Sequence, residues 1–562
     1  MIFATLLVFL VVTGLVKYFL HMRHMESYVK DLPIMRPVYP FIGNAHSFIG
    51  KSTAEMFSGI VNFVKENETP SKAYIGPVLN ITLDKPEDIK TVLMSSACLD
   101  KPYMYRFLPS TVGILTTESG AFWKQIRKLL NPTFNLKILQ SFVPIFNNKT
   151  NIMLENLDKE AGNPNFDLSR YMHACTLDMV CGELKILCVI EFTELHPTSS
   201  MNNCLIHHKT IYIHIEYLFL FFEMIGKKIQ LIGEIIILAT TMGFNVDVQR
   251  DKNQEFLKSI EAMCEIVGKR FLKFWAHSDF VYRWTGLYKV QQKHCENINI
   301  LTSRIRDMKR DEYFAKNKDK IAEKVISEDS EESYKTPQVL IDQLFGLFFS
   351  GKFNAQLVKE QIETVLIAGN ETSALTLSYT ILLLAMYPEI QDKLYEELHS
   401  VYDLQDEYTS YEKVQQLPYL DKVLKEGMRM FPVAPFIVRT ATADTAVSTC
   451  IIPKNAIIMM SIFNMQRRKD VWGEDAEEFN PEHFAPENAS TRHPFCFLPF
   501  SGGPRNCIGY QYAMISMKVI MSGILRNYRF TTNLKLSDLE MKFELTLKLA
   551  NKHMVGMERR VW

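Results

Sequence analysis

The pattern of apolar and polar positions divides the chain into a short apolar segment at the N-terminus and a long body of helical segments separated by polar turns. Residues 2–20 are almost wholly apolar, with Lys17 their only charged side chain, and such a run is just long enough to cross a bilayer as a helix. In the body, the longest helical pattern covers residues 357–387 and ends at Pro388. The β-prone segments are short and lie near residues 74–83, 451–458 and 545–549. The sequence therefore predicts a mainly α (α+β) protein with small peripheral β-sheets and an N-terminal transmembrane anchor helix.

The residues that flank the apolar segment indicate an uncleaved anchor rather than a signal peptide. No basic region precedes the segment and no small-residue cleavage site follows it. Lys17, Arg23 and Lys30 lie on its C-terminal side, which keeps the body cytosolic under the positive-inside rule. Closely spaced prolines then favour a stiff, extended connector. We expect three parts: an anchor at residues 1–22, a proline-rich hinge at 23–44 and a catalytic domain at 45–562.

Charge and cysteine content narrow the possible functions. Lys and Arg together number 63, as do Asp and Glu, so no global charge favours a nucleic acid as partner. The ten cysteines are scattered singly, without a CxxC pair. This spacing argues against a disulfide scaffold and for a reducing compartment.

One cysteine, Cys507, lies in a glycine-rich loop that leads into an amphipathic helix predicted at residues 508–527. The N-terminus of a helix favours a thiolate over a thiol through its dipole and its free N–H groups. Arg505 offers a planar fork that suits a carboxylate. A structural cysteine in a turn would explain Cys507 alone. It does not explain the residues at fixed offsets around it, which are Phe500, Gly503, Arg505 and Gly509.

These five residues resemble the haem-binding loop of the cytochromes P450, and the longer run at 492–513 is similar to the family-4 clan, in particular to its insect microsomal members. The resemblance implies a helical prism fold in which haem b lies between two long helices. It also implies that Cys507 is the axial ligand of the haem iron, and that Phe500, Gly503, Arg505 and Gly509 contact the cofactor.

A second motif is Ala368-Gly369-Asn370-Glu371-Thr372, midway along the predicted long helix. A glycine followed by an acid and a hydroxyl can open the helical hydrogen-bond ladder and leave a polar notch, although such a motif is more often a cap or a surface feature. An acid and an alcohol together suit proton delivery. The resemblance implies that Glu371 and Thr372 form the proton relay beside the haem. Family-4 members often carry a glutamate ester to haem where this chain has Ala368, so we expect non-covalent haem.

A third motif is Glu426 with Arg429, which share a helix face and can pair. An ordinary surface pair of this kind contributes well under about 1 kcal/mol. The resemblance implies that this pair is instead buried and holds the loop that carries the thiolate. Its usual third member is an arginine, and here His483 takes that place. Because histidine has fewer donors and titrates near neutrality, we expect a weaker network.

A fourth pattern is Trp123 with Arg127, one helical turn apart. An indole N–H and a guanidinium at this spacing can reach one carboxylate, although a core tryptophan beside a surface arginine is the ordinary interpretation. The resemblance implies that Trp123, Arg127 and Arg439 bind the haem propionates. The run at 175–178 is a further family-4-like marker, which we interpret as structural.

Residues 184–239 interrupt the resemblance with a segment rich in Ile, Leu and Phe. Charged residues divide its apolar runs, so none is long enough for a second membrane span. Joining Glu183 directly to Thr240 restores a family-like continuation, Glu-Thr-Thr-Met-Gly. We therefore predict that 184–239 is an insertion, retained intron sequence, with a membrane-docking loop as the alternative.

The resemblance implies a haem-dependent monooxygenase that inserts one oxygen atom from O2 into a C–H bond of an apolar substrate: a fatty acid, another lipid or a xenobiotic. No flavin or nicotinamide fingerprint stands out, so we expect electrons from NADPH–cytochrome P450 reductase, with cytochrome b5 as a further donor. The expected location is the cytosolic face of the endoplasmic reticulum membrane. Two alternatives are a haem-thiolate isomerase, which needs no reductase, and a non-catalytic haem protein inactivated by the insertion.

Overall fold

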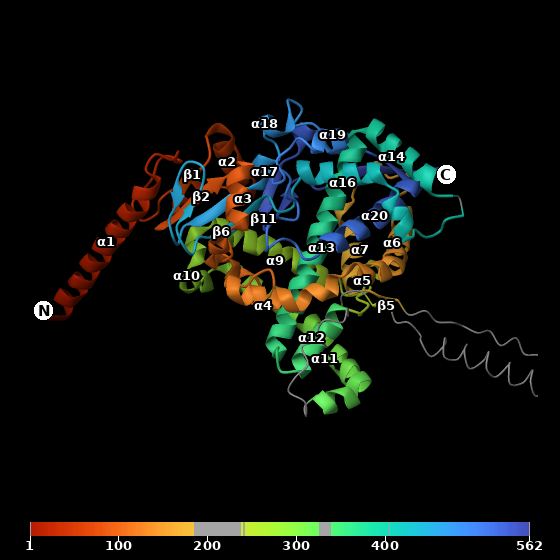
Figure 1. Ribbon diagram of the computed structural model, residues 1–562, viewed down its shortest axis with the longest axis horizontal. Coiled ribbons are helices and arrows are strands. Elements are labelled where there is room, and N and C mark those ends of the chain that lie inside the picture. Colours follow the sequence, from red (N-terminus) through yellow and green to blue (C-terminus); the bar gives the residue numbers. More distant parts are fainter. Residues whose placement is uncertain (1, 185–237, 240–241, 325–338, 404, 561–562) are drawn as a thin grey trace, which may run out of the picture.

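The computed structural model describes residues 2–184, 238–239, 242–324, 339–403 and 405–560. These residues form a largely helical body with a β-rich part on the side from which helix α1 (Ile2–Val29) projects (Figure 1). The further helices are α2 (Thr53–Glu66), α3 (Pro86–Met94), α4 (Gly120–Leu130), α5 (Leu136–Ser141), α6 (Val143–Leu157), α7 (Ser169–Cys181), α9 (Gln254–Leu272), α10 (Asp279–Arg283), α11 (Gly286–Lys324), α12 (Leu340–Phe349), α13 (Ala355–Met386), α14 (Pro388–Val401), α15 (Tyr411–Gln415), α16 (Pro418–Met430), α17 (Ile462–Met465), α18 (Lys469–Trp472), α19 (Pro486–Ala489) and α20 (Tyr510–Asn527). The predicted mainly helical fold is confirmed.

The sheets are small and lie at the edge of the helical body (Figure 1). The strands are β1 (Ser71–Ile75), β2 (Val78–Leu83), β3 (Phe166–Asp167), β4 (Glu183–Leu184), β5 (Leu238–Ala239), β6 (Phe436–Thr440), β7 (Thr445–Ala446), β8 (Ile451–Ile452), β9 (Ile457–Ser461), β10 (Tyr528–Thr531), β11 (Met541–Glu544), β12 (Thr546–Leu549) and β13 (Met554–Arg559). The largest sheet has the order β1-β2-β9-β6, in which β2 and β9 run parallel and the other neighbours antiparallel. The segment predicted at 451–458 divides into β8 and β9, because the turn between them places Asn455 at φ 70°.

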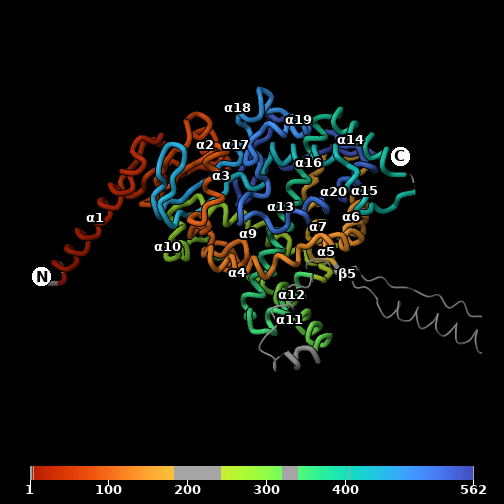
Figure 2. Tube along the Cα trace, viewed as in Figure 1, coloured from red at the N-terminus to blue at the C-terminus, as the bar shows by residue number. Residues whose placement is uncertain are grey.

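Helix α13 runs through the centre of the body, packed against both α7 and α20 (Figure 2). It begins where the Asn354 side chain accepts a hydrogen bond from the Leu357 N–H at 2.8 Å, and it ends just before Pro388. Gly369 allows α7 to approach closely, because a Cβ atom there would lie 2.9 Å from a methyl group of Val180. The predicted helix at 508–527 begins two residues later, at Tyr510, with Gly509 as its N-cap residue.

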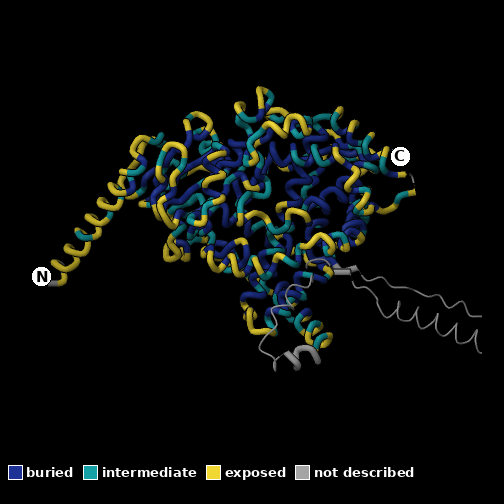
Figure 3. Tube along the Cα trace, viewed as in Figure 1, coloured by how far each residue is buried: buried dark blue, intermediate teal, exposed yellow. Residues whose placement is uncertain are grey.

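Helix α1 combines an exposed apolar part with a docked C-terminal turn. The segment Thr5–Val29 is the one described helix that by itself is long and apolar enough to cross a membrane. Its side chains up to Leu20 are mostly exposed, whereas Met25 and Val29 are buried against the sheet (Figure 3). The Glu26 carboxylate accepts hydrogen bonds from Lys72 at 2.6 Å and from the Tyr74 hydroxyl at 2.7 Å. The boundary expected at residue 22 therefore falls inside α1, and the first part of the expected hinge is helical and fixed to the body.

The chain leaves and re-enters the body at one place around the expected insertion. Strands β4 and β5 pair antiparallel, with Glu183 opposite Ala239. The Phe244 N–H donates to the Cys181 carbonyl at 2.7 Å. Asp178, from the family-4-like run, accepts hydrogen bonds from the N–H groups of the two residues at 248 and 249, which holds the returning chain against α7. Most of the expected insertion, residues 185–237, lies outside the described residues.

Candidate haem-thiolate site

The loop at residues 500–509 brings Cys507 to the start of α20. Gly503 has φ 69°, and a Cβ atom there would collide with the Leu93 carbonyl, so only glycine fits. The Cys507 N–H donates to the Phe500 carbonyl at 2.9 Å, which closes the loop. The Phe500 ring meets the Tyr510 ring edge-on, with 4.8 Å between the ring centroids. These contacts fix the direction in which the thiol leaves the backbone.

The Cys507 side chain is exposed. Burial raises the pKa of the Cys507 thiol, while the Gly509 N–H and the positive charge of Arg127 act in the opposite direction. A bound iron would reverse the net effect, because a coordinating thiol is deprotonated outright.

Three buried cations, Lys101, Arg439 and Arg505, gather beside this loop. Burial and the two arginine charges hold the pKa of Lys101 well below its usual range, and burial together with Arg439 lowers the pKa of Arg505 to about 9. No carboxylate of the described residues lies within ion-pair distance of any of the three, and the Arg505 Nε atom has no hydrogen-bond partner among those residues. Uncompensated buried cations are costly unless anions join them, so the residues present fit the two propionates of a haem.

Residues of the cation cluster were only partly predicted from the sequence. Trp123 lies beneath the Arg505 guanidinium, with 5.3 Å from the ring centroid to the guanidinium carbon. Lys101, which donates to the Tyr105 hydroxyl at 3.1 Å, was not predicted, and neither was Tyr105. Their four-residue spacing at the start of an aromatic run is the only sequence signal for the pair.

Arg127 points to the cysteine loop rather than to the cation cluster. Its guanidinium donates to the Asn506 carbonyl at 2.7 Å and to the Asn506 side chain at 3.0 Å. Its Nε donates to Asn131 at 2.6 Å. Arg127 therefore ties α4 to the residue immediately before Cys507, and its predicted contact with a propionate stays a prediction.

On α13, Glu371 and Thr372 face different surroundings. The Thr372 side chain is exposed, although it lies in the middle of a mostly buried helix, and its hydroxyl donates to the Ala368 carbonyl at 2.7 Å. Glu371 is buried, and its Oε1 accepts from Lys548 at 2.8 Å and from Thr546 at 3.1 Å. Burial raises the pKa of Glu371, but Lys548 and the nearby His173 outweigh burial and lower it. The alcohol is therefore accessible, whereas the acid is held at the back of the helix.

Glu426 and Arg429 form a fully buried, two-bonded ion pair, with both N–H···O distances at 2.7 Å. Arg429 also donates to the carbonyls of residues 466, 476 and 478, in the segment that precedes the cysteine loop. His483 lies between two carboxylates: its Nδ1 is 3.0 Å from Glu426 and its Nε2 is 3.2 Å from Asp475. Burial raises the pKa of Glu426, but Arg429 and His483 more than offset it, so the pKa is lowered.

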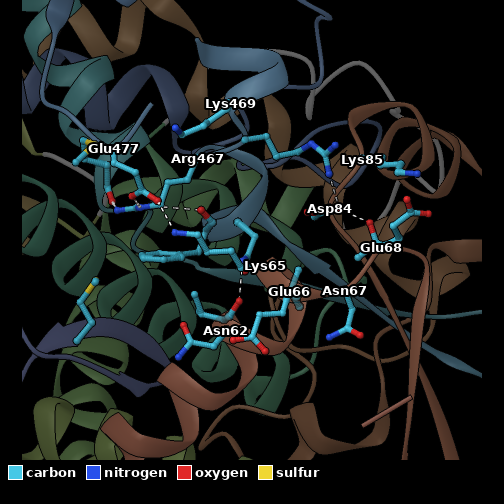
Figure 4. A pocket seen from close by; sticks show the side chains of 18 of the residues that line it. Asn62, Lys65, Glu66, Asn67, Glu68, Asp84, Lys85, Arg467, Lys469 and Glu477 are labelled. Atoms are coloured by element: carbon cyan, nitrogen blue, oxygen red, sulfur yellow. Dashed lines mark hydrogen bonds and ion pairs between the residues drawn. The ribbon is translucent and has the colours of Figure 1, made fainter. Parts of the chain in front are cut away.

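A surface hollow of about 720 Å³ lies elsewhere, between α2 and the segment around Arg467 (Figure 4). Its charged groups pair with one another, as in Lys65 with Glu477 at 3.1 Å and Arg468 with Asp84 at 3.0 Å. None of the predicted cofactor residues lines it. The volume of this hollow therefore does not indicate the active site. The exposed thiol of Cys507 and the unpaired buried cations beside it are the better indication.

An accessible cysteine at a helix N-terminus, beside buried cations without carboxylate partners among the described residues, is an arrangement that suits a haem-thiolate site. The cytochrome P450 family model matches residues 33–190 and 230–556, and the chain belongs to this family. It is therefore a monooxygenase of the oxidoreductase class. The chain is 27% identical to cytochrome P450 4V2 of Homo sapiens, covering 96% of this chain and 93% of that protein. It is 26% identical to cytochrome P450 4c21 of Blattella germanica (91% and 89% covered) and 25% identical to cytochrome P450 4c3 of Drosophila melanogaster (97% and 91%).

Proposed function

We propose that this chain binds haem b non-covalently through Cys507 and inserts one oxygen atom into a C–H bond of an apolar substrate. The observation that carries the proposal is the buried group Lys101, Arg439 and Arg505, which has no carboxylate partner among the described residues and lies beside an accessible thiol. When bound, the haem supplies the oxygen chemistry, and a thiolate ligand favours O–O cleavage. The protein holds the cofactor, positions the substrate and controls protons.

The predicted site residues take three roles in this proposal. The propionates are bound by Lys101, Arg439 and Arg505, with Trp123 packed beneath. The thiolate loop is shaped by Phe500, Gly503 and Gly509 and is held from α4 by Arg127 through Asn506. The backbone before that loop is held by Glu426, Arg429 and His483. Ala368, in place of an ester-forming glutamate, supports the non-covalent state.

Glu371 and Thr372 move protons in this proposal. The accessible Thr372 hydroxyl can hold a proton at its Oγ1 or pass one on. The adjacent Glu371 holds the next proton. Lys548 and Thr546 bind one of its carboxylate oxygens, and the other oxygen is left to accept a proton.

Electrons come from NADPH–cytochrome P450 reductase, with cytochrome b5 as a second donor, at the cytosolic face of the endoplasmic reticulum. The sequence supports this because it lacks a nucleotide-binding fingerprint of its own. The apolar helix α1 and its basic C-terminal flank support the location and orientation. A membrane setting favours a fatty acid, another lipid or an apolar xenobiotic as substrate.

Residues 184–239 are proposed to be an insertion that the family fold does not need. Two observations support this: the paired strands β4 and β5 at its ends, and the family match, which is interrupted at residues 191–229. Sequencing the transcript across codons 183 and 240 tests the retained-intron origin. A mature message without the segment supports that origin, and a message that contains it contradicts it.

The function is tested by the carbon-monoxide difference spectrum of the reduced full-length protein, followed by turnover with NADPH and reductase. A long-wavelength Soret band with NADPH-dependent oxygenation of lipids or xenobiotics is the expected result. Conversion of a peroxide substrate without NADPH would instead indicate a haem-thiolate isomerase. A protein without haem, in a sample that is otherwise folded, would indicate an inactive product. Cys507→Ser is the matched control and should lose the long-wavelength band.

A further inference from the structure

Behind α13, on the side where Glu371 is buried, titratable side chains from several elements meet in the protein interior. They are His173 on α7, Glu261 and Cys264 on α9, Lys548 on β12, and His553 directly before β13, with the Thr546 hydroxyl beside them. Core positions between packed helices are ordinarily apolar. A cluster of this kind at the back of a proposed proton relay requires an explanation.

One oxygen of Glu371 is left free by the ion pair. Its Oε1 takes the bonds from Lys548 and Thr546, while Oε2 faces the Nδ1 of His173 at 3.6 Å. Neither of these two atoms has a hydrogen-bond partner among the described residues, and Glu371 and His173 are only 1% and 4% exposed. Buried polar atoms of this kind are usually joined by a water or by a small side-chain movement. The two atoms are therefore placed to exchange a proton.

The register between α7 and α13 keeps His173 beside Glu371. Thr176, one turn beyond His173, donates to the Asn370 side chain at 2.8 Å. Asn370 immediately precedes Glu371. Helices α7 and α13 therefore bring polar side chains together at two successive places, Thr176 with Asn370 and His173 with Glu371. The packing of the two helices thus fixes the position of His173 beside Glu371.

A second histidine belongs to the same buried cluster. The His553 Nε2 is buried and has no hydrogen-bond partner among the residues that the structure describes. Burial lowers the pKa of His553, while the charge of Asp167 acts in the opposite direction.

We propose that His173 is the proton donor to Glu371. In each transfer the N–H bond at His173 Nδ1 breaks and an O–H bond forms at Glu371 Oε2, leaving a neutral imidazole and a neutral carboxyl group. A proton from solvent then restores His173, so atoms and charge balance without a further reactant. The proposal rests on the proposed function, in which Glu371 passes its proton toward Thr372.

Several other groups around Glu371 influence whether its carboxylate accepts a proton. Lys548 and Thr546 hold Oε1 from β12, Glu261 and Cys264 approach from α9, and Tyr379 lies two turns further along α13. Lys548 favours the ionised carboxylate, and the Lys548 pKa is itself raised by Glu371 despite burial. Among the described residues, the His173 Nδ1 is the ionisable atom that faces Oε2.

The first test needs no turnover. Full-length protein with 13C-labelled histidine is studied by NMR in detergent, with and without Glu371→Gln, in the reduced carbon-monoxide form. The ring signals of His173, identified through His173→Gln, should shift and change their pH dependence in Glu371→Gln. Those of His294, which bonds Ser259 away from the cluster, should not. Unchanged His173 signals would overturn the proposal whatever the enzyme catalyses.

The second test measures how reducing equivalents are used. At equal haem content, His173→Gln should lower the product formed per NADPH oxidised about tenfold, raise hydrogen peroxide and increase the solvent isotope effect. His294→Gln should leave all three quantities unchanged. A merely structural role would lower haem content and stability without altering the ratio of product to hydrogen peroxide. An unchanged ratio therefore overturns the proposal. If wild type forms no product at all, the proposed monooxygenation fails, while the NMR comparison still decides the role of His173. If His173→Gln takes up no haem, His173→Asn replaces it.

Discussion

At the scale of single residues, His483 shows how one substitution changes a buried network without dissolving it. The ring lies between Glu426 and Asp475, and each ring nitrogen faces one carboxylate. A protonated imidazole has two donors for these two acceptors, whereas a neutral ring has one. An arginine has five donors and keeps its charge at any relevant pH. The imidazole of His483 therefore offers these two carboxylates fewer donors than an arginine would.

We predict that His483→Arg raises the free energy of unfolding by about 1 kcal/mol, the net contribution of one added hydrogen bond. The gain is expected because a guanidinium offers more donors to Glu426 and Asp475 than an imidazole does. Urea unfolding followed by haem absorbance at about pH 7 measures it. His483→Gln, a neutral residue of similar length, is the control and should not gain stability. Equal stability of His483→Arg and wild type would contradict this account.

The lowered pKa of Glu426 makes the free energy of unfolding depend on pH in the acid range. Its pKa is lower in the folded protein than in the unfolded chain, so its contribution is fully present above the unfolded value, about 4.3, and is lost as pH falls through the folded value. Glu426→Gln should cost about 3–5 kcal/mol at pH 7, because it leaves Arg429 buried without its partner. The loss of stability between pH 5 and pH 3 should then become smaller. An unaltered acid slope in Glu426→Gln would show that other carboxylates dominate acid unfolding.

At the scale of elements, local patterns were predictable and long-range partners were not. The predicted long helix lies within about two residues of α13, because asparagine capping and Pro388 are local signals. The partner of Glu371 on β12 is 175 residues away along the chain, and no periodicity connects them. Lys101 was missed for the same reason, since its meaning appears only when folding brings Arg439 and Arg505 beside it.

We predict that deleting residues 184–239 preserves the fold. Opposite residues of an antiparallel pair such as Glu183 and Ala239 have Cα atoms about 5 Å apart, close to the spacing of bonded neighbours, so the two ends of the segment lie close together. The deletion variant should take up haem at least as well as the full chain and should melt at the same or a higher temperature. Deletion of α11 (Gly286–Lys324), which packs against α9 and α13, is the control and should unfold the protein. Loss of haem in the 184–239 deletion would show that the segment is needed.

At the scale of the whole molecule, the anchor is part of the folded body. Lys72 is buried, and besides Glu26 it donates to the carbonyls of Val29 and Lys30 at 2.7 and 3.2 Å. All three of these acceptors come from the end of α1 or the residue after it. The sheet therefore depends on α1 to neutralise a charge in its interior.

We predict that an N-terminal truncation lowers the thermal stability of the protein only if it removes the residues of α1 that contact Lys72. Removing residues 1–20 leaves these contacts intact and should not change the melting temperature in detergent. Removing residues 1–30 leaves Lys72 buried without its carboxylate and should cost about 3 kcal/mol, with earlier loss of haem on heating. Combining the longer truncation with Lys72→Met should restore most of the loss. Equal melting of both truncated proteins would show that the contact is not stabilising.

Because α1 is continuous from Ile2 to Val29 and is clamped at its last turns, the body follows any change in the tilt of the helix. A helix whose apolar length does not match the thickness of its bilayer adjusts by tilting. In a flexibly tethered enzyme that adjustment would be absorbed by the linker, whereas here it rotates the catalytic body as a unit. Membranes of different thickness would then hold the catalytic body at different angles to the bilayer. Lipid composition thereby becomes a physical determinant of the orientation of the enzyme.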